Sequence, residues 1–391
     1  MKTIVILGGG YAGINLIHSL KKDLSSELGK NIRIILVDKQ AYHFRKVLLF
    51  RAITEESELK IPFQRYLSEG VEFVQGEVLE LKKGEKKLCL KVEQEQIDIS
   101  YDYLVIALGS VMKENPVRLG GIQLTDLNSA HAIRKQLNNI IEQAKSVNDV
   151  LLRKELLSIA VVGGGISGIE TVAELAVWFK EQLRQARINP AEAKLFLFDP
   201  NSHLLHNTPL KVSLKLERKL NEMGVQFVSN ARVKEYKDGQ IYCVDGRTFS
   251  VGACIVTTGT KANPIIQTFH LPVSENNQLI VDDCYCVEGY IDIFAIGDCA
   301  RVIDSNTQHI DGMTCKEAIP QAQRLSKIIK SKVFNIPNRI THQEYPVKLY
   351  CISLGPKSGF VWVQKWGMNF ILSDKLGLKL REYTWEQASL L

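Results

Sequence analysis

A glycine motif that occurs twice constrains this sequence more than any other feature. A run of aliphatic residues beginning at Ile4 leads into Gly-x-Gly-x-x-Gly and then into an apolar helical pattern, and residues 158–175 repeat this arrangement. Such a run is typical of a strand that is buried on both faces of a parallel sheet. The glycines of the two copies are Gly8, Gly10 and Gly13, and Gly163, Gly165 and Gly168. The repetition predicts two α/β units of the same kind.

The spacing of these glycines fits the binding of a dinucleotide. The first glycine makes a tight turn, the second lets the backbone approach a pyrophosphate, and the third lets the helix pack closely on the strand. The helix N-terminus then favours the negative charge of the phosphates. An acidic residue ends the next predicted strand of each copy, Asp38 and Asp199, where a carboxylate can bind ribose hydroxyls and would repel a 2′-phosphate. We therefore expect an α/β fold with two Rossmann-like dinucleotide-binding domains.

The duplication extends beyond the glycines. In each half, alternating strands with a turn are followed by another aliphatic strand, at 101–110 and at 253–264. One more aliphatic strand ends at Asp298, and we expect it to return the chain to the first unit. A polar helical stretch that begins near Asn128 is expected to be a solvated connector. The predicted domains are a discontinuous first nucleotide domain of residues 1–120 and 285–344, a second nucleotide domain of residues 150–284, and a small C-terminal α+β region of residues 345–391.

Composition and charge exclude several classes of protein. The 391 residues carry a formal net charge of +6 at pH 7, without a dense Lys/Arg patch among aromatics, so we expect no nucleic-acid partner. No apolar run approaches the length of a transmembrane helix. The eight cysteines include no C-x-x-C pair and no metal-ligand spacing, so we expect no metal site. A cytoplasmic location is expected, with peripheral attachment to the inner face of the cell membrane left open.

Together, these motifs resemble the two-dinucleotide-binding-domain flavoproteins, the superfamily of glutathione reductase. The resemblance rests on GGGYAG, YDYLVIALGS, GGGISG, TTGT and IFAIGDCA, which follow one another in the family's order. It implies that FAD and NADH are the cofactors. By resemblance, the FAD-binding residues are Gly8, Gly10, Gly13, Asp38, Gly109 and Asp298. Those for NADH are Gly163, Gly165, Gly168, Asp199 and Gly259.

The positions of the cysteines narrow the choice within this superfamily. Its disulfide reductases carry a redox-active cysteine just after the FAD ribose acid or a C-x-x-C pair in the nicotinamide unit, and its sulfide:quinone oxidoreductases need one between the glycine motifs or near the second. No cysteine occurs between Cys89 and Cys243 here. We therefore expect electrons to leave the flavin directly, without dithiol chemistry.

Within the superfamily, the chain most resembles the type II NADH:quinone oxidoreductases. AYHFRKVLL, GGGISGIETVAEL and ISLGPKSG are similar to three stretches of that family. The resemblance implies an FAD-dependent NADH dehydrogenase that passes electrons to a quinone. It also implies that Lys46 contacts the flavin ring and that Glu170 lies close to the nicotinamide.

The helix that would face the acceptor departs from the family pattern. In TCKEAIPQAQ, Lys316, Glu317 and Ala322 replace the residues of the family motif, whereas Gln321 is kept and Pro320 lies inside the helix. By resemblance, Glu317 and Gln321 are the candidate catalytic residues on this helix. An exposed surface position is the alternative for Glu317, as it is for Lys46 and Glu170.

Two other functions remain open from the sequence. The first is an NAD(P)H reductase of a soluble electron-carrier protein such as a ferredoxin, which the basic charge of the chain would suit. The second is a flavin-bound NADH sensor without significant turnover. The expected partners are a quinone or another small electron acceptor, with a homodimer left open. The aromatic residues after 345 could form a dimer surface, a membrane contact or ordinary core.

Overall fold

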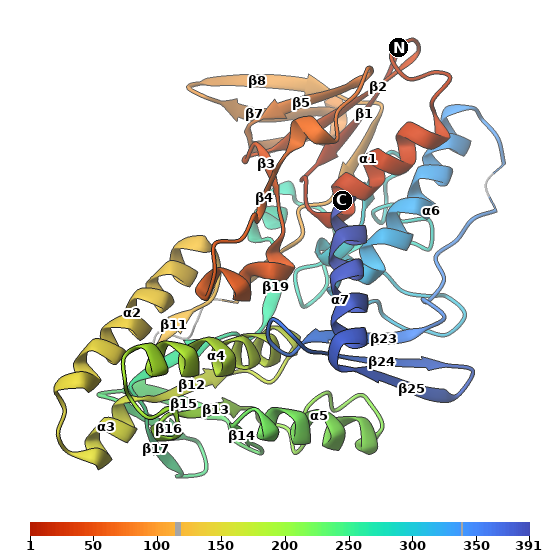
Figure 1. Ribbon diagram of the computed structural model, residues 1–391. Helices are drawn as coiled ribbons and strands as arrows, with labels where there is room; N and C mark the ends of the chain where they lie inside the picture. The colour runs from red at the N-terminus through yellow and green to blue at the C-terminus, as the bar shows by residue number, and fades with distance from the viewer. Residues whose placement is uncertain (114–118, 338) are drawn as a thin grey trace.

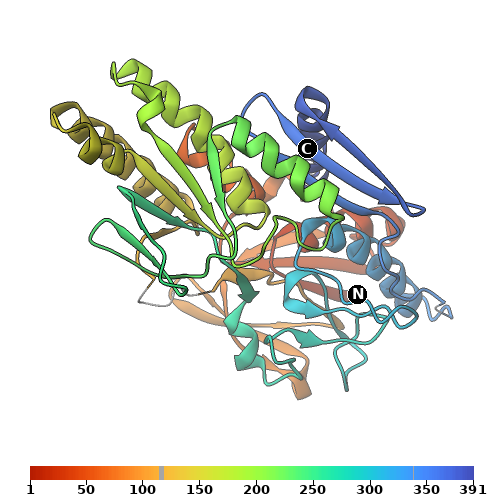
Figure 2. The ribbon, with the colours of Figure 1, turned by 90° about the horizontal axis from the view of Figure 1, so that it is seen from below.

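The computed structural model describes residues 1–113, 119–337 and 339–391 as two α/β units and a small C-terminal unit. Each α/β unit is built on a five-stranded parallel sheet. Figure 1 shows the first unit above the second, and Figure 2 shows the C-terminal strands beside the second unit. The expected α/β fold with two Rossmann-like domains is confirmed.

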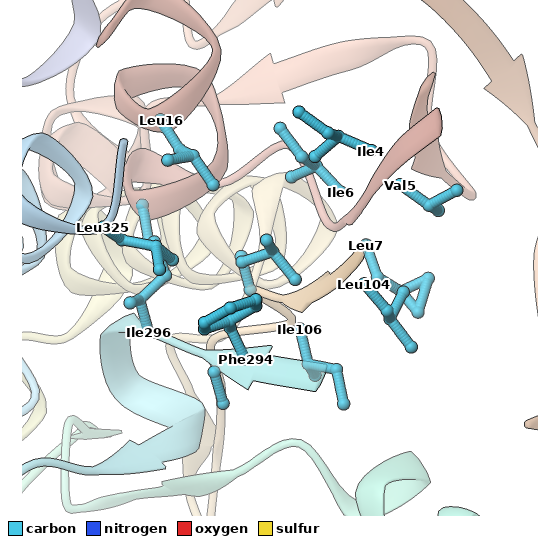
Figure 3. Packing of buried hydrophobic residues seen from close by; sticks show 14 of the residues in the cluster. Ile4, Val5, Ile6, Leu7, Leu16, Leu104, Ile106, Phe294, Ile296 and Leu325 are labelled. Atoms are coloured by element: carbon cyan, nitrogen blue, oxygen red, sulfur yellow. The ribbon is translucent and has the colours of Figure 1, made fainter. Parts of the chain in front are cut away.

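The first sheet has the strand order β21-β9-β1-β2-β5. Its strands are β21 (Ile293–Ala295), β9 (Tyr103–Ile106), β1 (Lys2–Leu7), β2 (Ile32–Asp38) and β5 (Val71–Gln75). Helices α1 (Tyr11–Asp23) and α6 (Cys315–Val333) pack against each other beside it. Figure 3 shows the resulting core, in which Leu16 of α1, Leu325 of α6 and Phe294 of β21 lie near one another. Burial of β1 on both faces explains its unbroken aliphatic sequence.

The second sheet repeats this pattern with the order β11-β18-β12-β13-β14. Its strands are β11 (Ile122–Gln123), β18 (Ala253–Val256), β12 (Ser158–Val162), β13 (Lys194–Phe198) and β14 (Val225–Val228). Its main helices are α4 (Ile166–Gln185) and α5 (Leu210–Glu222). Each unit also carries a three-stranded antiparallel sheet, formed by β6 (Glu77–Lys82), β7 (Lys87–Val92) and β8 (Glu95–Ser100) in the first and by β15 (Val233–Lys237), β16 (Gln240–Cys243) and β17 (Thr248–Ser250) in the second.

Helix α2 (Leu127–Ser146) is not the solvated connector that we expected. Ile133, Leu137 and Ile140 lie on one buried face, and this face packs against η1 (Lys46–Ile53), an apolar 3₁₀ helix of the first half of the chain. The spacing of these residues is that of an amphipathic helix. The expectation was wrong because the polar side chains of α2 obscured this face. Helix α3 (Val150–Leu156) then leads to β12.

Three further pairs of short strands connect segments of the described chain. Strand β10 (Ser110–Met112), from the first half of the chain, pairs antiparallel with β19 (Thr260–Ala262), from the second half. The segment that follows Gly109 thus meets its counterpart, the segment that follows Gly259. Near the first sheet, β3 (Tyr42–Phe44) pairs with β4 (Lys60–Pro62), and β20 (Leu279–Ile280) pairs with β22 (Ala300–Arg301).

The C-terminal unit consists of an antiparallel sheet and one helix. The sheet contains β23 (Lys348–Ser353), β24 (Gly359–Lys365) and β25 (Met368–Ser373), and helix α7 (Asp374–Ser389) packs on β23 and β24. The aromatic residues of this unit divide between core and surface, since Trp362 is buried whereas Trp366 is 81% exposed. Among the described residues, no helix combines the length and the apolar character needed to cross a membrane.

Candidate active site

A cavity of about 1010 Å³ lies where the two nucleotide units, the start of α6 and helix α7 meet. Its volume is at the upper end of the range for ligand pockets, about 300–1,000 Å³. Its lining includes both glycine turns, through Gly10 and Gly165, and α7, through Arg381 and Tyr383. One cavity is therefore open to both turns.

The two glycine turns have the same backbone geometry. Gly8 and Gly163, which begin the turns, have φ values of +104° and +114°, a region that side chains with a Cβ rarely adopt. A Cβ on Gly13 would lie 1.9 Å from the carbonyl oxygen of Gly8, and a Cβ on Gly168 would lie 1.8 Å from that of Gly163. The third glycine is thus required by close packing of helix on turn in both units.

The middle glycines leave space for a ligand. Apart from the adjacent residues and the backbone of its own helix, no atom of the described residues lies within 4 Å of a Cβ built on Gly10 or on Gly165. Both residues are N-caps, of α1 and α4, and neither helix start has a side-chain cap. Free N–H groups that face open space at a helix N-terminus fit a pyrophosphate. The residues present therefore suit a dinucleotide at each turn.

The two acids that follow the turns make the same contact but differ in environment. Oδ2 of Asp38 accepts the N–H of Gly9, and Oδ2 of Asp199 accepts the N–H of Gly164, both at 2.7 Å. Asp38 lines the cavity, and burial raises its pKa. Oδ1 of Asp199 also accepts the backbone and side-chain N–H groups of Asn201, at 2.9 and 2.8 Å. Asp199 is not among the described residues that line the cavity.

Lys46 and Asp298 lie at one end of the cavity, around Ser110. The Ser110 hydroxyl donates to Oδ2 of Asp298 at 2.6 Å, and Nζ of Lys46 donates to the Ser110 carbonyl at 3.3 Å. Burial raises the pKa of Asp298 and lowers that of Lys46, and the opposite charge of each residue opposes the shift of the other. Gly109 and Gly259, at equivalent places in the two units, also line the cavity, with φ values of +62° and +66°.

Glu170 has a partner that no sequence motif indicated. Nε and Nη2 of Arg381, on α7, donate to Oε1 and Oε2 of Glu170 at 2.9 and 3.2 Å, and the Ser353 N–H donates to Oε1 at 2.9 Å. Both side chains of the ion pair are buried and line the cavity. Burial raises the pKa of Glu170, whereas the Arg381 guanidinium opposes this shift. The carboxylate thus reaches the cavity already paired with a cation.

The first unit has an amide at the position of Glu170. Asn15 follows Gly13 by two residues, as Glu170 follows Gly168. The side-chain amide of Asn15 donates to the carbonyl of Ala388 at 2.9 Å. The same position of each glycine motif therefore contacts α7.

Helix α6 directs its first turn at the cavity, but two expected residues point elsewhere. Thr314, Cys315 and Lys316 line the cavity, whereas Glu317 and Gln321 are not among the described lining residues. Glu317 is not the exposed residue that we considered, since it is 8% exposed and its Oε2 accepts the Thr314 hydroxyl at 2.7 Å. Gln321 is 2% exposed, and its Oε1 accepts the N–H of Gly297 at 2.8 Å.

Comparisons with known proteins agree with this geometry. The family model described as pyridine nucleotide-disulphide oxidoreductase matches residues 2–323. A type II NADH:quinone oxidoreductase of Haemophilus influenzae is 28% identical over 368 residues, which cover 86% of this chain and 80% of that protein.

Solved structures share the fold. NDH2 from Plasmodium falciparum in complex with NADH has a TM-score of 0.79 at 19% identity, with 99% of this chain and 94% of that chain covered. The covalent putidaredoxin reductase–putidaredoxin complex gives a TM-score of 0.68 at 18% identity, with 99% and 93% covered. Since the family model spans most of the sequence and includes both glycine turns and Asp298, the chain belongs to the pyridine nucleotide-disulphide oxidoreductase family.

Proposed function

We propose that this protein is an FAD-dependent oxidoreductase that takes hydride from NADH and passes electrons to a quinone without a redox-active disulfide. The observation that carries the proposal is the pair of glycine turns of equal geometry that open into one cavity. The relative from Haemophilus influenzae bears the name of this activity. Bound FAD supplies the redox chemistry.

In this proposal the first unit holds FAD. The turn with Gly8, Gly10 and Gly13 binds the pyrophosphate, Asp38 binds the ribose, and Gly109 and Asp298 lie along the path to the ring. Lys46 offers a cation at the Asp298 end of the cavity. The start of α6 lacks a side-chain cap at Thr314, so its N–H groups favour negative charge that develops in the cavity.

The second unit holds NADH. Gly163, Gly165 and Gly168 bind its pyrophosphate, Asp199 binds its ribose, and Gly259 lies at the strand end that faces the first unit. Glu170 lies at the junction and orients the guanidinium of Arg381 through their two hydrogen bonds.

The cavity thiols support a route without dithiol chemistry. Cys315 and Cys351 line the cavity and are both free thiols. Burial raises the pKa of Cys351 to about 11 and also raises that of Cys315. A thiol rather than a thiolate is a poor nucleophile, so these side chains are unsuited to disulfide exchange at neutral pH.

Apolar and aromatic lining residues from α6, β23 and α7 support a quinone over a carrier protein. Ile319, Pro320, Tyr350 and Tyr383 line the cavity, and apolar and aromatic groups suit a flat, apolar ring. The second candidate is the reductase of a soluble electron carrier, because the putidaredoxin reductase complex shares the fold and the net charge of +6 suits an acidic partner.

Salt dependence distinguishes the two acceptors. We expect turnover with NADH and a water-soluble quinone to change by less than about two-fold as salt is raised, since a neutral acceptor is not steered by charge. Turnover with an acidic ferredoxin should be slow at every salt concentration. Fast ferredoxin reduction that falls by about ten-fold or more with salt, together with slow quinone reduction, would favour the carrier function instead.

An exposed apolar face in the C-terminal unit supports attachment to an anionic membrane. Met368, Phe370 and Leu372 alternate along β25 and are each at least 42% exposed, so they share one face of the strand. Trp366 and Leu376, close to this strand in the sequence, are also exposed, as are Lys365, Lys375 and Lys379. Exposed apolar groups with lysines near them in the sequence are typical of contact with a negatively charged lipid surface.

Sedimentation with vesicles rich in phosphatidylglycerol tests this attachment. We expect the protein to bind, and Phe370→Glu to release it. Leu151→Glu is the matched control, because Leu151 is 71% exposed on α3 and lies outside this face. If Phe370→Glu instead breaks a dimer in light scattering and leaves vesicle binding unchanged, the face contacts a second copy of the chain.

A further inference from the structure

A buried row of polar side chains lies behind the turn that carries Gly297 and Asp298. The Tyr285 hydroxyl lies 3.0 Å from Nδ1 of His342, and Nε2 of His342 lies 3.4 Å from Oδ1 of Asp311. Nε2 of Gln321 donates to Oδ2 of Asp311 at 2.8 Å. Oε1 of Gln321 then accepts the N–H of Gly297, also at 2.8 Å. We call Tyr285, His342, Asp311 and Gln321 the Asp311 network.

These side chains are almost completely shielded from water. Tyr285, His342 and Gln321 are each no more than 2% exposed, and the Asp311 side chain is 5% exposed. Gln321 comes from α6, whereas the other three come from segments before and after that helix. Buried polar groups are costly when they lack a partner, so each member of the network depends on its neighbours.

The donors and acceptors from Asp311 through Gln321 to Gly297 fit together in one direction. Burial raises the pKa of Tyr285, so its phenol keeps its proton, and its hydroxyl is hydrogen-bonded to Nδ1 of His342. Nε2 of His342 is the ring nitrogen that faces Asp311. Burial also raises the pKa of Asp311, but contacts with His342 and Gln321 outweigh burial and hold this pKa below its ordinary value. As an acceptor-only carboxylate, Asp311 requires the amide nitrogen of Gln321, which leaves the amide oxygen for Gly297.

We propose that the Asp311 network positions the FAD-binding turn. Gln321 is a positioning residue that fixes the N–H of Gly297, and through this turn it places the carboxylate of Asp298, which the Ser110 hydroxyl also contacts. Gly297 has a φ of +74°, so the turn needs such a fixed partner to hold one geometry. This role rests on FAD binding by the first unit and is independent of the acceptor.

Two single variants each replace one partner of the hydrogen bond between Asp311 and Gln321. In Asp311→Asn, the amide offers one acceptor oxygen in place of two, so an N–H group replaces an acceptor towards either Gln321 or His342 and the charge that Gln321 donates to is lost. In Gln321→Glu, two carboxylates face each other. We expect each variant to raise the dissociation constant of FAD by about 10- to 100-fold, the loss expected for a hydrogen bond to a charged group. FAD release from the purified holoprotein and visible circular dichroism of the bound flavin measure this effect without NADH or an acceptor.

The double variant Asp311→Asn/Gln321→Glu restores a hydrogen-bonded amide–carboxylate pair, with the amide at position 311 and the carboxylate at position 321. The amide introduced at position 311 would donate to the carboxylate introduced at position 321, which would accept from Gly297. We expect the FAD dissociation constant of the double variant to lie within about three-fold of the wild-type value, because complementary pairs in one network are coupled. A general loss of packing would instead make the two defects add.

Glu344→Gln is the matched control. This substitution also replaces a carboxylate by an amide near this loop, but Oε1 of Glu344 lies 3.7 Å from Nδ1 of the exposed His309. It should leave FAD binding unchanged. Single variants with wild-type FAD affinity and circular dichroism, or a double variant as weak as the sum of the two, would overturn the proposal. If a single variant does not fold, the double variant decides alone on the same three-fold criterion. If the wild-type protein does not reduce a quinone, the proposed acceptor is overturned but this positioning role is not.

Discussion

The two nucleotide units are nearly the same in their turns and differ in what their turns contact. In both, the first glycine of the motif has a left-handed backbone and the third glycine packs on the first. In both, an acid also accepts the N–H of the residue that directly follows the first glycine. In the first unit, the site is completed by a strand that returns from beyond the second unit, β21. In the second, the matching outer strand, β11, precedes the unit. In the proposed function the repeated turn binds a dinucleotide, and the surroundings of each turn assign it to FAD or NADH.

Helix α7 shows the same contrast at one position. The first unit contacts it through the neutral amide of Asn15, and the second through the buried Glu170–Arg381 ion pair. Ala388, which accepts the Asn15 bond, lies seven residues after Arg381, about two helical turns. A single helix thus spans both glycine motifs, which explains why the two turns open into one cavity.

The largest effect should come from breaking the ion pair. Glu170→Gln leaves the Arg381 guanidinium buried without its partner charge, and we expect it to lower the free energy of unfolding by about 3–5 kcal/mol. The counterpart Asn15→Ala removes a neutral bond and should cost about 1 kcal/mol. Denaturant unfolding measures both, and equal losses would remove the distinction between the two contacts.

Lowering the pH should destabilise the first unit because His43 becomes protonated on unfolding. This side chain is buried, with Nδ1 3.0 Å from the carbonyl of Gly9, and burial lowers its pKa from 6.5 to about 4. Since the unfolded chain binds this proton at higher pH than the folded chain, stability is present above pH 6.5 and is lost as the pH falls towards 4. The loss amounts to about 3 kcal/mol. Unfolding and FAD release across this range should become less pH-dependent in His43→Gln, and not in the exposed control His131→Gln.

Replacing the third glycine of each motif by alanine should weaken the binding of a different cofactor in each case. Gly13→Ala and Gly168→Ala each place a Cβ against a carbonyl oxygen, and we expect each to destabilise the protein by about 1–3 kcal/mol. Gly13→Ala should also lower FAD content, whereas Gly168→Ala should keep FAD and bind NADH weakly. Gly84→Ala, which has no atom within 4 Å of the new Cβ, is the control. Loss of FAD from Gly168→Ala alone would reverse the assignment of the units.

Nucleotide preference should change through Asp199. Asp199→Arg replaces repulsion of a 2′-phosphate by attraction, and we expect the ratio of kcat/KM for NADH to that for NADPH to fall by about ten-fold or more. Asp38→Arg should not change this ratio, because it belongs to the other unit, but should weaken FAD binding. An unchanged ratio in Asp199→Arg would remove Asp199 from its proposed role.

The parts of the site that depend on local spacing could be predicted from the sequence. The glycine turns and the acids after the strands follow from short motifs, because turn geometry is set by neighbouring residues. Contacts between distant segments could not, since Glu170 and Arg381 are 211 residues apart and the α7 sequence contains no motif that marks an arginine for this role.

Which side of α6 faces the cavity could not be predicted from the sequence either. Lys316, Ile319, Pro320 and Gln323 recur at helical spacing and line the cavity, while Glu317 and Gln321, four residues apart, occupy the adjacent stripe. A motif fixes which residues lie on a helix but not which stripe faces the ligand. Packing of α6 on α1 decides that.

Anaerobic titration of the purified, FAD-loaded protein with NADH tests the central claim most directly, because flavin absorbance counts the electrons that the site accepts. We expect one equivalent of NADH per FAD to bleach the flavin completely, and one equivalent of a menaquinone analogue to restore it. A requirement for two equivalents of NADH would reveal a second redox centre such as a disulfide. A reduced flavin that the quinone does not reoxidise would contradict the proposed acceptor.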